Sequence, residues 1–333
     1  MKVKTLNSNH AARALIGFLL SFLLASCSQT DIHPHVGRTE GFVTVGDGVK
    51  LYYVEKGSGS EVLVAPAALY LEPLLLDELS ANRRVIFYDP RNRGQSDRTD
   101  LSSVSLDRQI EDLEELRIEL GLEQMMLLGW SSFGLEMAVY SMRHPERVTR
   151  LVQISPIAPA ASIVEQFGDT RVQQSDRLAI EALDRQADAG AFDESPEEYC
   201  RLRSKLTIPA NFVNADLASL VPDDCKYPNE WPENRSPYFR AFFATFGEFD
   251  WRDDLNSLKI PRLIIHGRED GIPLEGAKAW AAGYADVRLL VLSPSGHFPF
   301  IEQKEAVIAA IETFLGGEWP RDAIVIPSDN DRY

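Results

Sequence analysis

The amino-acid sequence predicts an α/β fold with a mostly parallel, doubly wound sheet and an inserted helical cap. Short apolar runs alternate with segments of helical spacing between residues 61 and 156, and this alternation resumes after residue 254. The intervening stretch, 157–254, holds helical pieces, prolines and aromatic residues but no strand-like run. Because alternating strands and helices favour a parallel sheet covered by helices, we expect 41–156 and 255–315 to form one core that carries 157–254 as an insertion.

The first half of the predicted core opens with a hairpin. Residues 41–57 alternate apolar and polar side chains on both sides of Gly46, Asp47 and Gly48, which are typical turn residues. The later runs are apolar throughout, as in buried parallel strands. Gly121 and Pro145 mark the ends of two helices. The expected strands are 61–66, 83–89, 123–129 and 150–156, and the expected helices are 71–83, 103–121 and 131–145.

The second half of the predicted core repeats the same unit twice. Residues 261–267 and 287–293 have the composition of buried strands, and 274–284 and 304–315 have helical spacing. The polar tail, 316–333, is not assigned an element.

The N-terminal residues have the pattern of an export signal. A basic start is followed by an apolar run over 14–25, which is shorter than the roughly 20 residues that a membrane-spanning helix needs. The run ends in Leu24, Ala25, Ser26 and Cys27, which resemble a bacterial lipobox. This resemblance implies a signal peptide at 1–26, lipidation of Cys27, a linker over 27–40, and anchoring in the bacterial cell envelope, at the outer membrane if the host has one. An ordinary cleaved signal with a chance cysteine is the alternative.

The charge and the cysteine content limit the kinds of partner, metal and cofactor that we expect. A formal net charge of −16 argues against nucleic acid, since phosphate binding needs a positive surface. Cys200 and Cys225 are expected to form a disulfide in an oxidising compartment, with two free thiols as the alternative. They are too far apart, and too poor in neighbouring histidines, for a metal site. Residues 57–60 lack the Lys-Ser/Thr of a phosphate-binding loop, and no cofactor is expected.

A serine stands where a strand is expected to turn into a helix. The stretch LLGWSSFG, residues 127–134, has the setting of a nucleophile elbow, which displays a serine hydroxyl at the edge of a sheet. The expected pattern G-x-S-x-G fits Ser131 after Gly129, but Phe133 replaces the last glycine. Choosing Ser132 would recover Gly134 and lose the first glycine. We predict Ser131 as the nucleophile and keep Ser132 as the alternative.

A serine hydroxyl needs a base, and the base needs a carboxylate to orient it. In this type of fold the chain order is serine, then acid, then histidine. Asp270 follows the strand expected at 261–267, and His297 follows the strand expected at 287–293. Reacting groups gather at the carboxyl ends of parallel strands, so Ser131, Asp270 and His297 should meet there. Glu269 is the alternative acid.

Four stretches of this chain resemble the α/β-hydrolase superfamily, and its cap-bearing branch of proline iminopeptidases and related esterases in particular. They are YDPRNRGQSD (88–97), LLGWSSFG, HGRED (266–270) and SGHFPFIEQ (295–303). The resemblance covers about residues 41–314, with the inserted segment weakly matched. It implies that Ser131 attacks an acyl carbon, that His297 transfers protons and that Asp270 holds the imidazole. It also implies a structural role for Asp89, Arg91 and Arg93.

Two backbone N–H groups should stabilise the developing oxyanion. One is expected from Ser132, directly after the nucleophile. The other should come from the loop after 61–66, where relatives carry His-Gly and this chain has Ala-Pro-Ala-Ala. Pro66 has no N–H to donate. Ala67 is therefore the predicted donor, with Ala68 as the alternative.

The sequence predicts a serine hydrolase of a small carboxylic ester or of an N-terminal prolyl or aminoacyl amide, such as a short peptide. Aromatic residues of the cap should line part of an apolar pocket. An aminopeptidase would also need a cap carboxylate for the substrate amine, for which Glu194, Glu197, Glu198 and Glu233 are available. The alternative is a non-catalytic protein that binds a small molecule on the same fold. Hydrolysis of epoxides or carbon–halogen bonds is disfavoured, since in the family it usually goes with Asp at the elbow.

Overall fold

The protein is described from a computed structural model. The structure describes residues 36–167, 170, 176–255, 258–282 and 286–327. The predicted signal peptide 1–26 and the predicted lipidation site Cys27 lie outside the described residues. Within the described part of the chain, no helix is long and apolar enough to cross a membrane.

The core is an eight-stranded sheet with the order β1-β2-β4-β3-β5-β6-β7-β8. The first two strands form the predicted hairpin, β2 pairs antiparallel with β4, and all later pairs are parallel. The sheet is thus mostly parallel, as predicted. The strands are β1 (Val36–Thr44), β2 (Lys50–Gly57), β3 (Val62–Pro66), β4 (Arg84–Tyr88), β5 (Met125–Trp130), β6 (Val148–Ile154), β7 (Arg262–Gly267) and β8 (Val287–Leu292).

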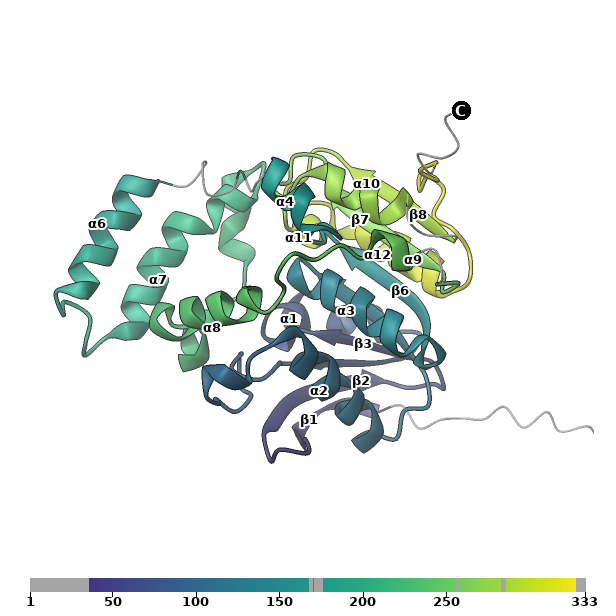
Figure 1. Ribbon diagram of the computed structural model, residues 1–333, viewed down its shortest axis with the longest axis horizontal. Coiled ribbons are helices and arrows are strands. Elements are labelled where there is room, and N and C mark those ends of the chain that lie inside the picture. The colour runs from purple at the N-terminus through teal and green to yellow at the C-terminus, as the bar shows by residue number, and fades with distance from the viewer. Residues whose placement is uncertain (1–35, 168–169, 171–175, 256–257, 283–285, 328–333) are drawn as a thin grey trace, which may run out of the picture. The chain divides into compact units, whose positions relative to one another are not determined.

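Helices cover both faces of this sheet (Figure 1). Helices α2 (Leu106–Glu119), α3 (Ser132–Arg143) and α10 (Leu274–Ala282) pack their buried side chains into one apolar cluster. Helices α1 (Ala68–Leu79) and α12 (Lys304–Leu315) contribute to a second cluster on the other face. Buried apolar surface on both sides explains why the parallel strands are apolar throughout. The structure confirms the predicted doubly wound α/β fold.

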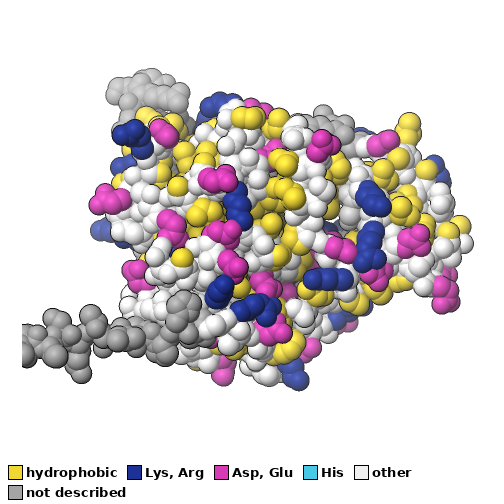
Figure 2. Space-filling view, turned by 180° about the vertical axis from the view of Figure 1, so that it is seen from behind, with side chains coloured by type: hydrophobic (Ala, Val, Ile, Leu, Met, Phe, Trp, Pro, Cys, Tyr) yellow, Lys and Arg dark blue, Asp and Glu magenta, His cyan; other side chains and the backbone are white. Residues whose placement is uncertain are grey.

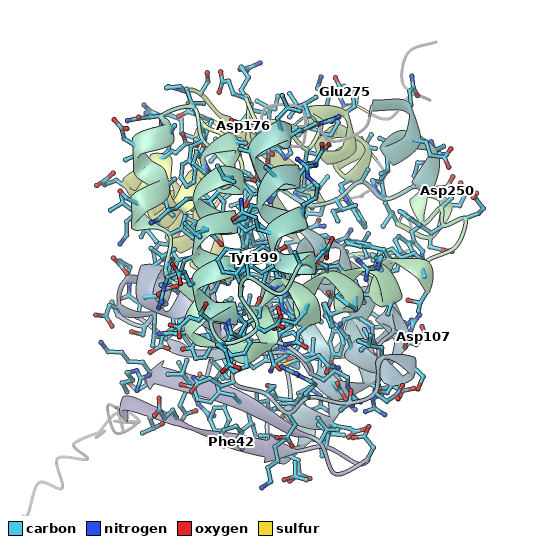
Figure 3. The ribbon with its side chains drawn as sticks, turned by 90° about the vertical axis from the view of Figure 1, so that its left-hand side faces the viewer. Phe42, Asp107, Asp176, Tyr199, Asp250 and Glu275 are labelled. Atoms are coloured by element: carbon cyan, nitrogen blue, oxygen red, sulfur yellow. A yellow bond between two sulfur atoms is a disulfide. The ribbon has the colours of Figure 1, made fainter. Side chains whose placement is uncertain are left out.

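The inserted segment forms a helical cap. Its helices are α4 (Ala161–Phe167), α6 (Arg177–Asp188), α7 (Pro196–Thr207), α8 (Pro232–Ala244) and α9 (Arg252–Leu255), with short 3₁₀ turns η3 (Pro209–Asn211), η4 (Ala215–Leu220), η5 (Asp224–Lys226) and η6 (Pro228–Glu230). In Figure 3, which looks onto the cap, α6, α7 and α8 lie in front of the sheet, with Tyr199 of α7 near the centre. The predicted pair Cys200 and Cys225 forms a disulfide that joins α7 to η5, with 5.7 Å between the Cα atoms.

One predicted boundary needs correction. The linker predicted over 27–40 is too long, because β1 already begins at Val36 and pairs with β2.

The tail, 316–333, has no helix or strand in its described part, but it packs against the core. Ile324 exchanges backbone hydrogen bonds with Leu289 of β8 at 2.8 and 2.9 Å, and Trp319 packs on Phe314. The short apolar run over 323–326 was the available signal for this docking, within a tail that is otherwise polar.

Candidate active site

Ser131 lies in a sharp turn between β5 and α3. Its backbone has φ 60° and ψ −126°, a conformation that a residue with a Cβ atom rarely adopts. The turn is fixed to the neighbouring strand β6, because the Ser131 N–H donates to the carbonyl of Ile154 at 2.9 Å. This strained conformation, with a helix starting at the next residue, is the elbow geometry that the sequence predicted around Ser131.

The structure explains how the elbow tolerates Phe133 in place of glycine. A Cβ atom on Gly129 would lie 2.3 Å from the Phe133 carbonyl oxygen, and one on Gly134 would lie 2.9 Å from Pro156 Cβ. The close approach of strand and helix therefore requires glycine at 129 and at 134. Phe133 does not stand at that contact, and its buried side chain lines the cavity beside Ser131.

Ser131, His297 and Asp270 form one hydrogen-bonded chain. His297 Nε2 lies 3.1 Å from Ser131 Oγ, and His297 Nδ1 lies 2.9 and 3.1 Å from the two carboxylate oxygens of Asp270. Because an ionised carboxylate only accepts hydrogen bonds, Nδ1 carries the proton and Nε2 is free to accept from the serine hydroxyl. The three residues, each at the carboxyl end of a different parallel strand, have the arrangement needed to activate a serine.

Asp270 stays ionised although it is buried. Burial raises its pKa, but the neighbouring His297 and the hydrogen bond from it, with help from His266 and the Ile272 N–H, outweigh burial and lower the pKa to about 2. The alternative acid, Glu269, points elsewhere: it accepts from the Ser293 hydroxyl at 2.7 Å and from the Ser295 N–H at 2.8 Å. Asp270 therefore contacts the imidazole, and Glu269 braces the loop that carries it.

The histidine loop is held against the cap. The His297 N–H donates to the carbonyl of Asn211 at 2.8 Å. A Cβ atom on Gly296 would lie 2.3 Å from that same carbonyl oxygen, so only glycine permits this approach. Glu302, from the stretch SGHFPFIEQ, accepts from the N–H groups of Gly296 and Val213. The position of the imidazole thus depends on the cap as well as on the sheet.

The two predicted oxyanion donors flank the elbow. Ser132 is the first residue of α3, where a helix leaves its N–H groups without intrahelical acceptors and favours negative charge. Ala67 ends the loop after β3 in the left-handed conformation, with φ 70°, and Ala68 begins α1. Since β3 pairs in parallel with β5, Ala67 and Ser131 lie at the same edge of the sheet. Asp89 fixes this loop from behind by accepting the Leu69 and Gln95 N–H groups at 3.0 Å each.

A cavity of about 590 Å³ lies between the elbow and the cap. Ser131, Ser132 and His297 line it from the core, and one face each of α7 and α8 lines it from the cap. The candidates for binding a substrate amine, had the enzyme been an aminopeptidase, were Glu194, Glu197, Glu198 and Glu233, and none of these lines the cavity. Its apolar lining includes Trp130, Phe133, Ile157, Phe239, Phe243 and Phe298.

Sequence reasoning missed a buried ion pair that also lines the cavity. Arg93 donates from Nε and Nη2 to the two oxygens of Glu230, each at 2.9 Å, and both side chains are almost fully buried. The loop after β4 was predicted to be structural. That holds for Arg91, which binds Asp112 at 2.6 and 2.7 Å, whereas Arg93 reaches the cap. Arg93 stands in the stretch 88–97 that resembles the family, which could have marked it as a residue of interest. Its partner Glu230 lies in the inserted segment, which resembles the family only weakly.

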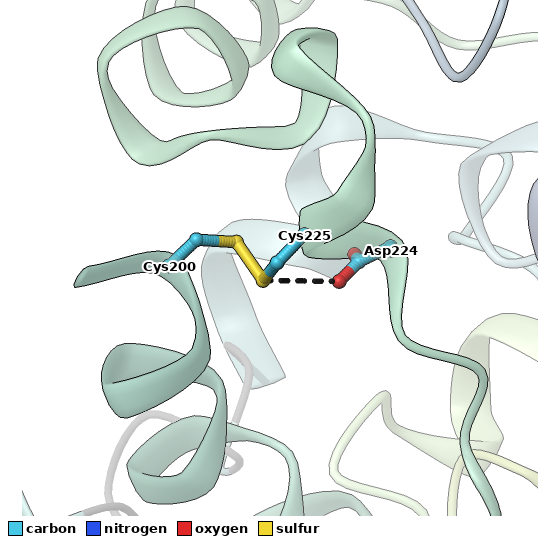
Figure 4. A group of neighbouring side chains, drawn as sticks. All are labelled: Cys200, Asp224 and Cys225. Carbon is cyan, nitrogen blue, oxygen red and sulfur yellow. Dashed lines mark hydrogen bonds between the residues drawn. A yellow bond between two sulfur atoms is a disulfide. The ribbon is translucent and has the colours of Figure 1, made fainter. Parts of the chain in front are cut away.

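The cluster of Cys200, Asp224 and Cys225 has the side-chain types of a metal site (Figure 4). The two sulfur atoms are bonded to each other, so they are not thiolate ligands. Asp224 instead accepts from Arg235 at 3.0 Å and from the Tyr70 hydroxyl. The cluster is therefore structural: the disulfide joins two parts of the cap, and Asp224 joins the cap to Tyr70 of α1.

Comparison with known proteins assigns this site to a family. The profile of the alpha/beta hydrolase fold family matches residues 65–304, which include the elbow, the acid and the histidine. The chain belongs to this family, and it is an α/β-hydrolase enzyme.

Individual relatives are distant. The chain is 27% identical to a proline iminopeptidase of Heyndrickxia coagulans over 83% of this chain and 98% of the relative. It is 28% identical to a pimeloyl-[acyl-carrier protein] methyl ester esterase of Aeromonas hydrophila subsp. hydrophila, over 58% and 71% of the two chains. The solved structure of a 2-hydroxy-6-oxo-6-phenylhexa-2,4-dienoate hydrolase from Rhodococcus sp. strain RHA1 covers 84% of this chain and 99% of its own, with 17% identity and a TM-score of 0.64, and shows the likeness of fold.

Proposed function

We propose that this α/β-hydrolase is a serine hydrolase that cleaves small carboxylic esters through an acyl-enzyme. The observation that carries the proposal is the hydrogen-bonded chain from Ser131 through His297 to Asp270 on the wall of a cavity. A serine next to a neutral imidazole that is oriented by an ionised carboxylate is an activated nucleophile. A non-catalytic binding protein would not need a serine, an imidazole and a carboxylate that are hydrogen-bonded in this order.

The chemistry follows from the positions of the three groups. Ser131 Oγ forms a bond to the ester carbonyl carbon while its proton passes to His297 Nε2. The carbonyl oxygen becomes an oxyanion, for which the N–H groups of Ser132 and Ala67 are the proposed donors. Collapse of this intermediate breaks the bond to the leaving alcohol, which takes the proton from His297 and leaves an acyl-enzyme.

The second half restores the enzyme. Water gives a proton to His297, its oxygen attacks the acyl carbon, and the Ser131 oxygen leaves and regains the proton. The sum is one ester and one water converted to an alcohol and a carboxylic acid, which ionises. Asp270 stays ionised throughout and stabilises the imidazolium.

Hydrolysis of N-terminal prolyl amides is the second candidate, favoured by the proline iminopeptidase similar to this chain. An aminopeptidase needs a carboxylate for the substrate's ammonium group. Among the described residues that line the cavity, Glu230 is the sole acid, and Arg93 already occupies both of its oxygens. The ester hydrolase therefore accords better with the site.

A fluorophosphonate probe tests the nucleophile. We expect the probe to label the wild-type protein and the Ser132→Ala variant but not Ser131→Ala, because the Ser131 hydroxyl contacts the imidazole. Turnover of p-nitrophenyl esters should follow the same order. Labelling that survives in Ser131→Ala and disappears in Ser132→Ala would move the nucleophile by one residue. Binding without labelling or turnover would favour the non-catalytic alternative.

We also propose that the enzyme is attached to an envelope membrane through a lipid on Cys27. The support is the apolar run that ends in a lipobox-like motif, together with the Cys200–Cys225 disulfide, which is typical of exported proteins. Metabolic labelling with an alkyne-tagged fatty acid should mark the wild-type chain and not Cys27→Ser. Equal labelling of both chains would refute the anchor.

A further inference from the structure

The cavity next to Ser131 has a lining rich in arginine, in a chain whose net charge is −16. Arg93, Arg203, Arg235 and Arg240 line it, and among the described lining residues Glu230 is the single carboxylate. On the surface in Figure 2, by contrast, acidic and basic side chains are interspersed. The arginines come from three elements, since Arg93 follows β4, Arg203 belongs to α7 and the other two belong to α8. Positive charge is therefore gathered where a substrate would lie.

Glu230 is not available to a ligand. Its oxygens accept from Arg93 Nε and Nη2 and from the Gly94 N–H, all at 2.9 Å, and its side chain is 0% exposed. Burial raises the pKa of Glu230, but Arg93, with Arg235 and the Gly94 N–H, outweighs burial and lowers it. A substrate ammonium group would meet the arginines without meeting a free carboxylate, which disfavours a cationic ligand.

Two of the four arginines have a carboxylate partner outside the lining. Arg235 donates to Asp224 at 3.0 Å, and Arg203 donates to Asp184 at 3.2 Å. Of the other two, Arg93 lies at an inner position, where Glu230 neutralises its charge, and Arg240 lies at an outer position and has no carboxylate partner among the described residues.

The inner position is Arg93. Its Nη1 atom is buried and has no hydrogen-bond acceptor among the described residues, although a buried donor normally has one. Its guanidinium lies 4.9 Å from the centre of the Phe239 ring and 6.0 Å from that of Phe133, next to the elbow.

The outer position is Arg240. It is exposed, lines the same cavity and forms no ion pair with a described residue. It shares its helix face with Phe239 and Phe243, which stand one residue before it and three after it, so apolar surface and a free cation lie side by side. An acyl chain could pack on the rings and place an anionic end at the guanidinium.

We propose that the substrates are carboxylic esters that carry a second, ionised carboxylate, and that Arg240 binds this carboxylate. This inference rests on the proposed function, because the ester group must reach Ser131. The reaction converts a dicarboxylate monoester and water to the dicarboxylate, an alcohol and a proton. Arg240 binds the carboxylate that does not react, and Phe239 and Phe243 contact the methylene chain.

The test uses two esters of equal chain length, mono-p-nitrophenyl glutarate and p-nitrophenyl pentanoate, which differ by a carboxylate in place of a methyl group. We expect the wild-type protein to have the higher kcat/KM for the glutarate. Arg240→Gln should lower the glutarate-to-pentanoate ratio of kcat/KM about five- to tenfold, the size of a partly exposed charge-assisted contact. The matched control is Lys205→Gln, which removes a positive charge from an exposed position of α7 that does not line the cavity.

Each outcome decides a separate question. Pentanoate hydrolysis with no preference for the glutarate, or a ratio that Arg240→Gln leaves unchanged, overturns the anionic substrate and leaves the serine hydrolase standing. An equal fall in Lys205→Gln also overturns it, because the effect would then be one of overall charge. If neither ester is hydrolysed, the proposed function fails, and calorimetric binding of both esters to Ser131→Ala decides the inference. Tighter binding of the glutarate that Ser131→Ala/Arg240→Gln loses supports it, and equal binding overturns it.

Discussion

The proposed reacting groups and the proposed substrate cavity of this enzyme are built in different ways. Ser131, Asp270 and His297 each follow a parallel strand, so the sheet brings them to one edge, and the cap adds one backbone contact to the histidine loop. The cavity needs contacts between the insertion and the core, such as Arg93 with Glu230 and His297 with Asn211. The order of the strands therefore determines the reacting groups, whereas pairs of residues distant in sequence determine what the cavity accepts.

The largest effect expected from the core side comes from the acid. Asp270→Asn should lower kcat about 10⁴-fold, because an amide at this position lets Nδ1 accept a hydrogen bond and turns the imidazole to the tautomer that cannot take the serine proton. The measurement is steady-state hydrolysis of p-nitrophenyl pentanoate.

Glu269→Gln is the matched control for this substitution. The neighbouring carboxylate contacts Ser293 and Ser295 but not the imidazole, so the loss should stay within about tenfold. If Glu269→Gln proves as harmful as Asp270→Asn, both acids act on the histidine and the geometry of a single orienting acid is wrong.

The same contrast explains what the sequence could predict. Strand–helix alternation and four short stretches were enough to place Ser131, Asp270 and His297, because parallel strands bring their carboxyl ends to one edge. The ion pair of Arg93 with Glu230 could not be predicted, since 137 residues separate the two and the cap has no repeating strand that fixes its position. For the same reason the sequence could not show which acids of the cap face the cavity. The contact of the tail near Ile324 was indicated by no more than the short apolar run over 323–326.

The largest effect expected from the cap side is on stability. Glu230→Gln should lower the free energy of unfolding by about 3–5 kcal/mol, because it leaves Arg93 buried without a counter-charge. Urea unfolding measures the change. The double variant Arg93→Met/Glu230→Met removes both charges and should recover much of the loss. A single-variant loss below about 1 kcal/mol would mean that solvent reaches the Arg93 guanidinium and that the pair is not held in a buried environment.

The smallest expected effect is on the free energy of unfolding at acid pH, and it again involves the core. The pKa of Asp270 is about 2 in the folded protein and about 3.9 in an unfolded chain. The unfolded chain therefore binds more protons between these values, and the stabilisation is complete above about pH 5 and is lost progressively as pH falls through the folded pKa of about 2. Between pH 6 and pH 3 the wild-type protein should lose about 1 kcal/mol more free energy of unfolding than Asp270→Asn, as measured by urea unfolding.

The control is Asp188→Asn, at an exposed position of the cap, which should keep the wild-type change of unfolding free energy with pH. Equal slopes for wild type and Asp270→Asn would show that the imidazole does not hold this carboxylate ionised.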